Sequence, residues 1–299
     1  MDSSNTKIYY EKFFPSEKIF KWLKINEKRE LSFTIKGDIF LRYQTFNTLT
    51  EFNNKLRDLQ IEKIDVGGIY DVKPEKNKIK NVLQKELVFD IDLTDYERKC
   101  CLDKNICEKC IPLIKVSVEL LDYILKNELG FTSLSFVFSG RRGLHCWVND
   151  FFTLNFTEEI RSHIVSYIDK VTKSNMYNDK YTRILLKYKI YLFNQGFIKK
   201  EDLDDRKIFS KHIKILYDKM FLKIDQEVTK SLIHLIKMPF CVHPATTLLS
   251  LPIDPNSLDN FEKTYLIKLK DVIENPNVLN ESFRILDSWI CSKKKMNFF

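Results

Sequence analysis

Apolar and polar residues alternate along several short segments in the first half of the chain, which is typical of strands with one buried face. Residues 30–36 and 38–46 follow this pattern on either side of Gly37, so we predict a β-hairpin there. Residues 63–70 predict another strand, with paired glycines at a bulge or close approach, and the apolar run 86–93 predicts a fourth. Two more strands are expected at residues 133–140 and 143–150.

Elsewhere the apolar residues recur at helical spacing, and the breaks between these segments are polar. Residues 156–221 contain no proline and a single glycine, so we expect a small helical subdomain there. Gly130 fits the C-cap of the helix before it. The other helices are expected at residues 6–24, 48–59, 112–127, 226–236, 257–274 and 279–294. An exposed basic loop is expected at residues 73–85, and extended segments at 239–244 and 248–254.

This succession of strands and helices predicts an α/β (α+β) fold. We expect a core made of residues 1–155 and 222–299, the second part ending in the C-terminal helices. The helical subdomain, residues 156–221, lies between these two parts in the sequence. A chain of 299 residues with 44% hydrophobic residues is able to bury a core without disulfide bonds.

Charge and hydropathy exclude some functions. The chain has 49 basic and 41 acidic residues, a net charge of +8, which permits a polyanionic partner without requiring one. No stretch approaches the roughly 18 apolar residues that span a bilayer. The first residues lack a signal-peptide pattern. We therefore expect neither a membrane protein nor a secreted one.

Four of the seven cysteines lie within eleven residues, at positions 100, 101, 107 and 110. In a chain that is not secreted, such clustering favours a metal site over disulfide bonds. We predict that Cys100, Cys101, Cys107 and Cys110 bind one structural Zn²⁺ ion, because four thiolates leave no coordination position open for catalysis. The alternative is a group of small packing residues.

Asp90 and Asp92 stand two residues apart on the predicted strand 86–93, so their side chains share one face. Burying two unpaired carboxylates is costly, and a divalent cation with oxygen ligands, Mg²⁺ or Mn²⁺, would neutralise them. The alternative is a pair at a strand end that binds turn amides or lysine. An Asp-x-Asp motif is weak by itself.

A short segment between two predicted strands combines an arginine pair with two flanking glycines. Arginine binds phosphate with planar paired donors, and glycine lets backbone amides approach the ligand closely. We predict a phosphate-binding turn here, the alternative being a solvated hairpin with a core histidine. Its residues are Ser139, Gly140, Arg141, Arg142, Gly143, Leu144 and His145.

Lys237 and His243 lie on the extended segment around Pro239 and Pro244, where they would be able to meet a triphosphate. Taken alone, they are more often ordinary surface groups. Asp225 precedes a helical run, and its local pattern indicates a helix N-cap, not a metal ligand.

Together these motifs resemble the small catalytic subunit of eukaryotic and archaeal DNA primases, the eukaryotic branch more closely. The resemblance rests on ELVFDIDLTDY, the cysteine cluster, SGRRGLHCWV and KMPFCVHP, with RELSF, LRYQTF and KIDVGGIY before them in the same order. It covers about residues 6–255. Several independent motifs in one order make a chance match very improbable.

The resemblance assigns roles that the local pattern does not. It implies that Asp225 joins Asp90 and Asp92 as a third metal-binding carboxylate, and that Glu30 is a further acidic residue of the active site. Asp65 resembles the residue near the ribose hydroxyl, which would favour ribonucleotides. The implied triphosphate contacts are Arg42, Ser139, Arg141, Arg142 and His145, with Lys237, His243 and nearby His234 on the far side.

The same resemblance implies a catalytic core around an RRM-like mixed sheet, with a zinc knuckle at residues 96–112 and the helical subdomain. The implied activity is synthesis of RNA primers from ribonucleoside triphosphates on single-stranded DNA, with two Mg²⁺ or Mn²⁺ ions. The implied partners are the large primase subunit, as a heterodimer, and the DNA polymerase alpha complex, in the nucleus. Two alternatives stay open: a repair or end-joining primase-polymerase, and a non-catalytic zinc-bearing nucleic-acid adaptor.

Overall fold

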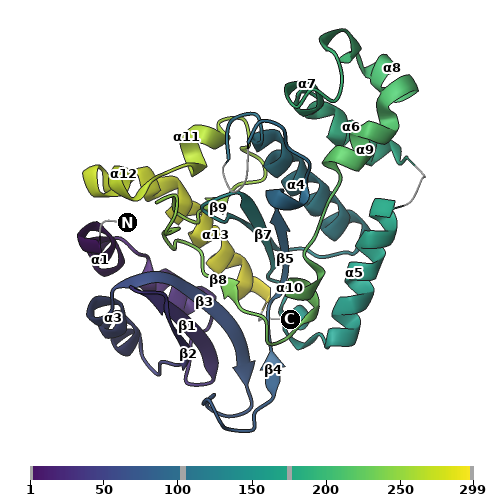
Figure 1. The fold of residues 1–299 in the computed structure, drawn as a ribbon. Helices are drawn as coiled ribbons and strands as arrows, with labels where there is room; N and C mark the ends of the chain where they lie inside the picture. The colour runs from purple at the N-terminus through teal and green to yellow at the C-terminus, as the bar shows by residue number, and fades with distance from the viewer. Residues whose placement is uncertain (1–2, 102–105, 174–176, 297–299) are drawn as a thin grey trace.

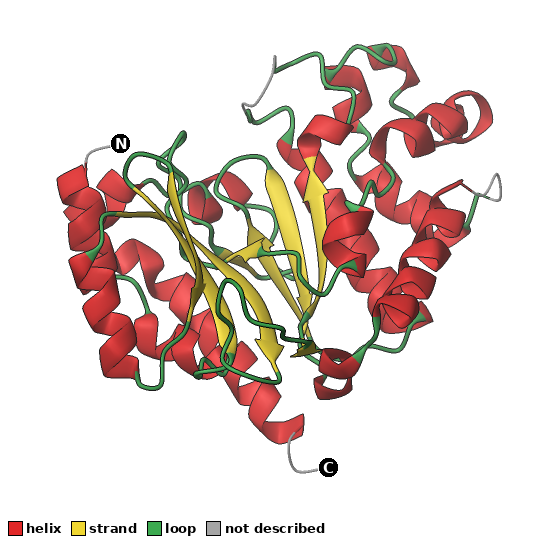
Figure 2. Ribbon diagram, turned by 60° about the horizontal axis from the view of Figure 1, so that its bottom comes forward, coloured by secondary structure: helices red, strands yellow, loops and turns green. Residues whose placement is uncertain are grey.

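The computed structural model describes residues 3–101, 106–173 and 177–296. Two antiparallel sheets lie in the middle of the molecule, and helices surround them (Figures 1 and 2). A separate group of helices projects from one end, at the upper right of Figure 1. Within the described part of the chain, no helix combines the length and the apolar character needed to cross a membrane.

The first sheet is built mainly from the N-terminal third of the chain. Its strand order is β2-β1-β3-β4, and β8 pairs with β3 at Asp65 and Val66. The predicted hairpin is confirmed: β1 and β2 are antiparallel, and Gly37 takes the left-handed conformation with φ of +87°. Its strands are β1 (Arg29–Ile35), β2 (Ile39–Gln44), β3 (Ile61–Tyr70), β4 (Val82–Gln84) and β8 (Ile236–Lys237).

The second sheet has the order β5-β7-β6-β9. Its strands are β5 (Leu87–Asp92), β6 (Leu134–Phe138), β7 (Gly143–Val148) and β9 (Pro252–Ile253). All pairings between the described strands are antiparallel, so the expected mixed sheet is corrected to two antiparallel sheets. The physical reason is that consecutive strands such as β6 and β7 are joined by tight turns, which reverse the chain.

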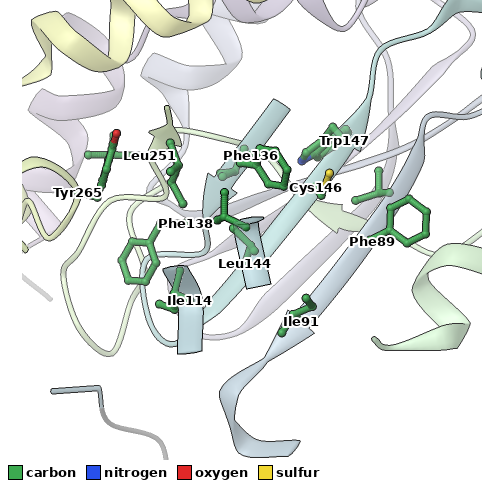
Figure 3. Close-up of a cluster of buried hydrophobic side chains, with 14 of the residues drawn as sticks. Phe89, Ile91, Ile114, Phe136, Phe138, Leu144, Cys146, Trp147, Leu251 and Tyr265 are labelled. Carbon is green, nitrogen blue, oxygen red and sulfur yellow. The ribbon is translucent and has the colours of Figure 1, made fainter. Parts of the chain in front are cut away.

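Buried apolar side chains fix the second sheet against the helix α4 (Ile111–Tyr123). Phe89 on β5, Cys146 on β7 and Phe136 on β6 come from adjacent strands and are all fully buried (Figure 3). Ile114 of α4 and Leu251 before β9 belong to the same cluster. This packing gives the end of β5, where Asp90 and Asp92 lie, a rigid support.

The N-terminal helices differ from the prediction. A single helix over residues 6–24 is wrong: α1 (Ser3–Lys12) and α2 (Ser16–Trp22) are separate, because Pro15 disfavours a helical residue before it. The helix α3 (Leu49–Asp58) is confirmed and begins at Thr48, whose side chain accepts a hydrogen bond from the Glu51 amide. Gly130, with φ of +74°, follows α4 and its final turn, as predicted.

The stretch 156–221 is helical, as expected. It contains α5 (Glu158–Lys173), α6 (Asp179–Lys187), α7 (Ile190–Asn194), α8 (Asp205–Lys207) and α9 (Ile213–Met220). The C-terminal helices are α10 (Gln226–Lys230), α11 (Phe261–Tyr265), α12 (Leu269–Glu274) and α13 (Asn280–Met296).

Three further expectations need correction. The helix expected at 226–236 ends at Lys230, because Ile236 and Lys237 must be extended to pair with β3. The helix expected at 257–274 is interrupted where the Ile267 carbonyl accepts a hydrogen bond from the Leu249 amide. The segment expected as a loop at 73–85 contains β4, which pairs with β3 and adds a strand to the first sheet.

Candidate active site and metal centre

Three aspartates lie near one another toward the end of β5. In the register of β5 and β7, Asp90 lies opposite His145 and Asp92 opposite Gly143. The Asp225 amide donates a hydrogen bond to the Asp90 carbonyl at 2.9 Å, which brings the start of α10 beside the strand. The structure thus brings together Asp90 and Asp92 from one strand and Asp225 from a segment more than 130 residues later.

Asp90 has two other negatively charged carboxylates near it, those of Asp225 and Asp92. Burial, and then the charges of Asp225 and Asp92, raise its pKa to about 7. His145 Nε2 lies 3.5 Å from an Asp90 oxygen, but burial and the nearby Lys237 charge lower the histidine pKa to about 3. His145 is therefore neutral near pH 7 and does not compensate the charge of Asp90. This uncompensated negative charge suits a divalent cation, and carboxylate oxygens are the donors that Mg²⁺ and Mn²⁺ prefer.

Asp92 is held by the phosphate-binding turn itself. Arg142 donates from Nε to one carboxylate oxygen at 2.7 Å and from Nη2 to the other at 2.9 Å. The Thr94 amide donates to the same carboxylate at 2.9 Å. Burial by itself would raise the pKa of Asp92, but these hydrogen bonds outweigh burial and lower it.

The turn between β6 and β7 has a fixed backbone. The Ser139 hydroxyl accepts a hydrogen bond from the Gly143 amide at 2.8 Å, and the Ser139 amide donates to the Gly143 carbonyl. Gly140 has a φ of +81°, and its carbonyl accepts a hydrogen bond from the Thr246 hydroxyl at 2.6 Å. The turn thus presents Arg141 and Arg142 from a backbone that cannot easily shift.

Lys237 connects the two sheets at this turn. It lies on β8, opposite Asp65 of β3, and its Nζ donates to the Ser139 carbonyl at 3.0 Å. Burial lowers the pKa of Lys237 to about 8. The link places cationic groups from both sheets at one edge of the carboxylate site.

His243 adds a neutral donor. Burial, followed by the charges of Lys237 and the arginine pair, lowers its pKa to about 3. Its Nδ1 accepts a hydrogen bond from the Ala245 amide at 3.2 Å. In a neutral imidazole the other ring nitrogen then carries the proton, so His243 offers Nε2–H to a ligand.

Other candidate residues lie on the first sheet. Glu30 is completely buried on β1, where its carboxylate accepts hydrogen bonds from Arg42 Nε at 2.9 Å and the Tyr70 hydroxyl at 2.8 Å. Glu30 and Arg42 lie on the first sheet, whereas Asp90 and Asp92 lie on β5 of the second. Arg42 already donates its hydrogen bonds to Glu30. Asp65 pairs with Lys63 at 2.9 Å. His234 lies nearby and is exposed, although partial desolvation of its ring and the Lys85 charge lower its pKa.

The four clustered cysteines converge. One sulfur from each of Cys100, Cys101, Cys107 and Cys110 lies within 4.8 Å of all the others. Among the residues that the structure describes, this is the only set of three or more potential ligands drawn together so closely. The donor set and spacing fit a tetrahedral Zn²⁺ site. The knuckle expected at 96–112 is described except for residues 102–105.

Sequence reasoning missed the residue that connects this cluster to the helical subdomain. Gln195 follows α7 and is 2% exposed. Its amide nitrogen donates to the Cys100 sulfur at 2.9 Å, and its oxygen accepts from the backbone amides of Lys99 and Cys100. Sequence reasoning also missed Tyr70, whose hydroxyl donates to Glu30, and Thr246, whose hydroxyl donates to the Gly140 carbonyl. No local sequence signal distinguishes these residues, because their partners lie far away in the chain.

Comparison with known proteins gives a consistent result. Residues 89–255 match the family model described as DNA primase small subunit. The DNA primase small subunit of Schizosaccharomyces pombe is 28% identical over 353 aligned residues, covering 92% of this chain and 78% of that protein. The corresponding protein of Saccharomyces cerevisiae is 27% identical, covering 92% and 87%.

An archaeal relative is more distant. The DNA primase small subunit PriS of Pyrobaculum islandicum is 25% identical over 238 residues, covering 78% of this chain and 73% of that protein. Among solved structures, the polymerase domain of Mycobacterium tuberculosis ligase D in complex with DNA has a TM-score of 0.47 at 11% identity. It covers 94% of this chain and 91% of that chain.

Proposed function

Because the chain belongs to the DNA primase small subunit family and is a DNA primase, we propose that it makes RNA primers by two-metal nucleotidyl transfer. In this reaction the primer 3′-hydroxyl attacks the α-phosphate of a ribonucleoside triphosphate, and pyrophosphate leaves. One observation supports the mechanism above all. Asp92 binds the arginine turn, Asp90 lies on the same strand with the Asp225 backbone bonded to it, and Lys237 contacts the turn.

The carboxylates would hold Mg²⁺ or Mn²⁺. Two such ions would lower the pKa of the attacking hydroxyl and stabilise the leaving pyrophosphate. The crowding that raises the pKa of Asp90 makes the site receptive to cations. Asp225 has a second role, because its side chain also accepts hydrogen bonds from the Glu227 and Val228 amides as the N-cap of α10.

The cationic and neutral donors would bind the triphosphate. Arg141 and Arg142 offer paired donors, and Lys237 a single charge. His145 and His243 contribute as neutral imidazoles, since both pKa values are lowered to about 3. Placing these groups before the reaction starts reduces the reorganisation needed as charge moves to the pyrophosphate. We further propose that Asp65 contacts the ribose, and that the Glu30–Arg42 pair supports this side of the site.

The partners follow from the family. A small subunit implies a large subunit, and primase activity implies DNA and nucleoside triphosphates as substrates. We propose that the chain forms a heterodimer with the large subunit, joins the DNA polymerase alpha complex and acts in the nucleus. Lys293, the first of three consecutive lysines near the end of the sequence, is half-buried, and its Nζ donates to the Trp22 carbonyl at 3.0 Å. Co-purification and imaging of a fluorescent fusion would test these assignments.

The activity test is product analysis on a homopyrimidine single-stranded DNA template, with ribonucleotides, Mn²⁺ and no primer. We expect short RNA products from the wild type and none from Asp90→Ala or Asp92→Ala, although both should fold. Asp225→Asn should also be inactive yet as stable as wild type, because asparagine is an equally good N-cap. Near wild-type synthesis by Asp92→Ala would contradict the proposal.

The same assay separates the alternatives. Extension of a supplied primer, with no products in its absence, would indicate that initiation needs the large subunit or that the chain acts as a repair polymerase. A preference for deoxynucleotides would favour the repair enzyme. Nucleic-acid binding that is unaffected by Mn²⁺ and nucleotide, without synthesis, would indicate an adaptor.

A further inference from the structure

Two residues to which the proposed function gives opposite roles bind each other in this structure. Arg142, proposed to bind phosphate, donates two hydrogen bonds to Asp92, proposed to bind a cation. The Thr94 amide donates to the same carboxylate. Asp92 therefore has few lone pairs left for a metal, and Arg142 has committed one of its two edges with paired donors, the Nε–Nη2 edge.

The guanidinium occupies the place of a cation. The Arg142 guanidinium donates to both carboxylate oxygens of Asp92 and balances their negative charge, as a divalent ion would. Asp90 has a different neighbour, because His145 Nε2 lies 3.5 Å from one of its carboxylate oxygens. The two aspartates of one strand are therefore in different states: Asp92 is blocked by Arg142, while Asp90 is not.

The block can be released by side-chain rotation alone. The Leu93 amide donates to the Arg142 carbonyl at 3.1 Å, and Asp92 lies opposite Gly143 in the ladder, so the backbone at both residues is fixed. The Arg142 and Asp92 side chains are 14% and 39% exposed, which leaves both within reach of an incoming ligand. A triphosphate would compete with Asp92 for the same guanidinium donors.

We propose that Arg142 is an exchangeable counter-ion, which holds Asp92 in the free protein and transfers to the triphosphate when the nucleotide binds. Asp92 is then released to the cation. The inference rests on the proposed function and deepens it. Because coupling between two ligands is reciprocal, nucleotide favours metal binding at Asp92, and metal at Asp92 favours nucleotide binding.

The first test measures Mn²⁺ binding to the zinc-loaded full chain without nucleotide, from the electron paramagnetic resonance signal of free Mn²⁺. Arg142→Lys keeps the charge but loses the paired donors. We expect it to bind Mn²⁺ about tenfold more tightly than wild type, the size of a typical coupling. Arg284→Lys is the matched control, because Arg284 also binds a carboxylate with paired donors, that of Glu281, but lies outside the site. It should stay within about twofold of wild type.

The outcomes are distinguishable. Equal Mn²⁺ affinity in wild type and Arg142→Lys would overturn the counter-ion inference while leaving the metal site intact. If neither protein binds Mn²⁺, even with a ribonucleoside triphosphate present, the proposed two-metal function fails. Equal gains in both lysine variants would also overturn the inference, because the effect would not depend on the Asp92 contact.

The reciprocal test measures triphosphate binding by equilibrium dialysis in the presence of EDTA. Asp92→Asn weakens the hold on Arg142, so we expect it to bind metal-free triphosphate about tenfold more tightly. Asp95→Asn is the matched control, because it removes the same charge three residues later without touching the Arg142 pair. Equal effects of the two variants would show a general charge effect and overturn the inference. Thermal melting of each variant establishes that it is folded.

Discussion

Gly140 controls the shape of the arginine turn through its backbone. Its φ of +81° lies in the left-handed region, where residues with a side chain are strained. A Cβ atom there would lie 3.0 Å from the Leu248 carbonyl oxygen and 3.3 Å from the His243 Cβ. The sequence marked this glycine as unusual, but the crowding arises from a segment more than 100 residues later.

Replacement of Gly140 by alanine should therefore disturb both stability and nucleotide binding. We expect Gly140→Ala to lower the free energy of unfolding by about 2–3 kcal/mol, from backbone strain and the clash with Leu248. Gly130→Ala is the control, since Gly130 has a similar φ of +74° but open space around it. That variant should lose only about 1 kcal/mol. Urea denaturation checks both, and equal losses would contradict the role of the close contact.

Two predictions concern Asp225. The local pattern indicated an N-cap, and the family resemblance indicated a metal ligand. The structure confirms the cap, because the Asp225 carboxylate accepts hydrogen bonds from the Glu227 and Val228 amides. It also brings Asp225 close enough to Asp90 to raise the pKa of Asp90. The metal role stays a prediction.

At the scale of elements, the helical subdomain is attached to the cysteine cluster through Gln195. Its side chain bridges the Cys100 sulfur, two backbone amides and the Lys109 carbonyl. Tyr191 on α7 adds a hydrogen bond to the Glu97 carbonyl at 2.7 Å. Side chains that bind a metal ligand from outside orient it and raise metal affinity.

Loss of Gln195 should weaken zinc binding. We expect Gln195→Ala to release zinc to a chromogenic chelator about tenfold faster than wild type, because Cys100 and its backbone lose their support. Gln84→Ala is the matched control, because the Gln84 side chain donates to the Asn155 side chain at 3.0 Å and not to a cysteine. Unchanged zinc release in Gln195→Ala would show that the cluster holds itself together without the helical subdomain.

The basic loop between β3 and β4, residues 71–81, has a conformation fixed by its own hydrogen bonds. Asp71 accepts hydrogen bonds from the Asn81 backbone and side chain, which closes the loop. Lys80 lies 4.2 Å from the centre of the Tyr43 ring. Lys76 and Lys78 are exposed, although Lys78 pairs with Glu75 at 3.0 Å. The loop is therefore able to present positive charge to a nucleic-acid backbone.

Neutralising this loop should reduce the salt dependence of template binding. We expect the triple change of Lys76, Lys78 and Lys80 to glutamine to flatten the slope of log affinity against log salt, because fewer counterions are released. Fluorescence anisotropy with labelled DNA over a range of salt concentrations measures the slope. The same triple change at Lys199, Lys200 and Lys207 in the helical subdomain is the control. An unchanged slope in the first variant would leave the loop as a solvated surface.

At the scale of the whole molecule, a buried ion pair connects the two sheets. Arg29 on β1 binds Glu86, just before β5, with two contacts of 2.8 Å, and the two side chains are 1% and 3% exposed. Arg29 also donates to the Gly67 and Leu23 carbonyls. Burial alone would raise the pKa of Glu86, but the Arg29 and Lys293 charges lower it to about 2.

This pair should give stability a distinct pH dependence. The folded-state pKa of Glu86 lies below its ordinary value of 4.5, so its contribution is complete above pH 4.5 and is lost as pH falls toward 2. Glu86→Gln leaves Arg29 buried without its counter-ion and should cost about 3–5 kcal/mol at pH 7. The difference from wild type should shrink between pH 4.5 and 2.

The matched control removes an exposed ion pair. Asp287→Asn breaks the pair with Lys18, whose side chains are 52% and 38% exposed, and should cost less than about 1 kcal/mol. Chemical denaturation at several pH values measures both variants. A Glu86→Gln loss as small as that of Asp287→Asn, or one independent of pH, would contradict a stabilising role for the buried pair.

The sequence by itself determined the longer strands, the helical character of residues 156–221, the cysteine cluster and the Asp90–Asp92 pair. These features depend on local periodicity and spacing, which residues close in the chain specify. The boundaries of the C-terminal helices were not determined locally, because pairing of Ile236 and Lys237 with β3 overrode helical periodicity. The family resemblance added Asp225 to the site before the structure placed it beside Asp90.

Only the tertiary structure decided which charges meet. Arg142 on Asp92, Arg42 on Glu30, Arg29 on Glu86 and Gln195 on Cys100 join segments from different elements. No local pattern specifies these partners, because a charged side chain has the same propensities whichever distant group it finally contacts. Burial between the sheets then sets the pKa values of Asp90, His145 and Lys237, since desolvation depends on the packed environment and not on sequence neighbours.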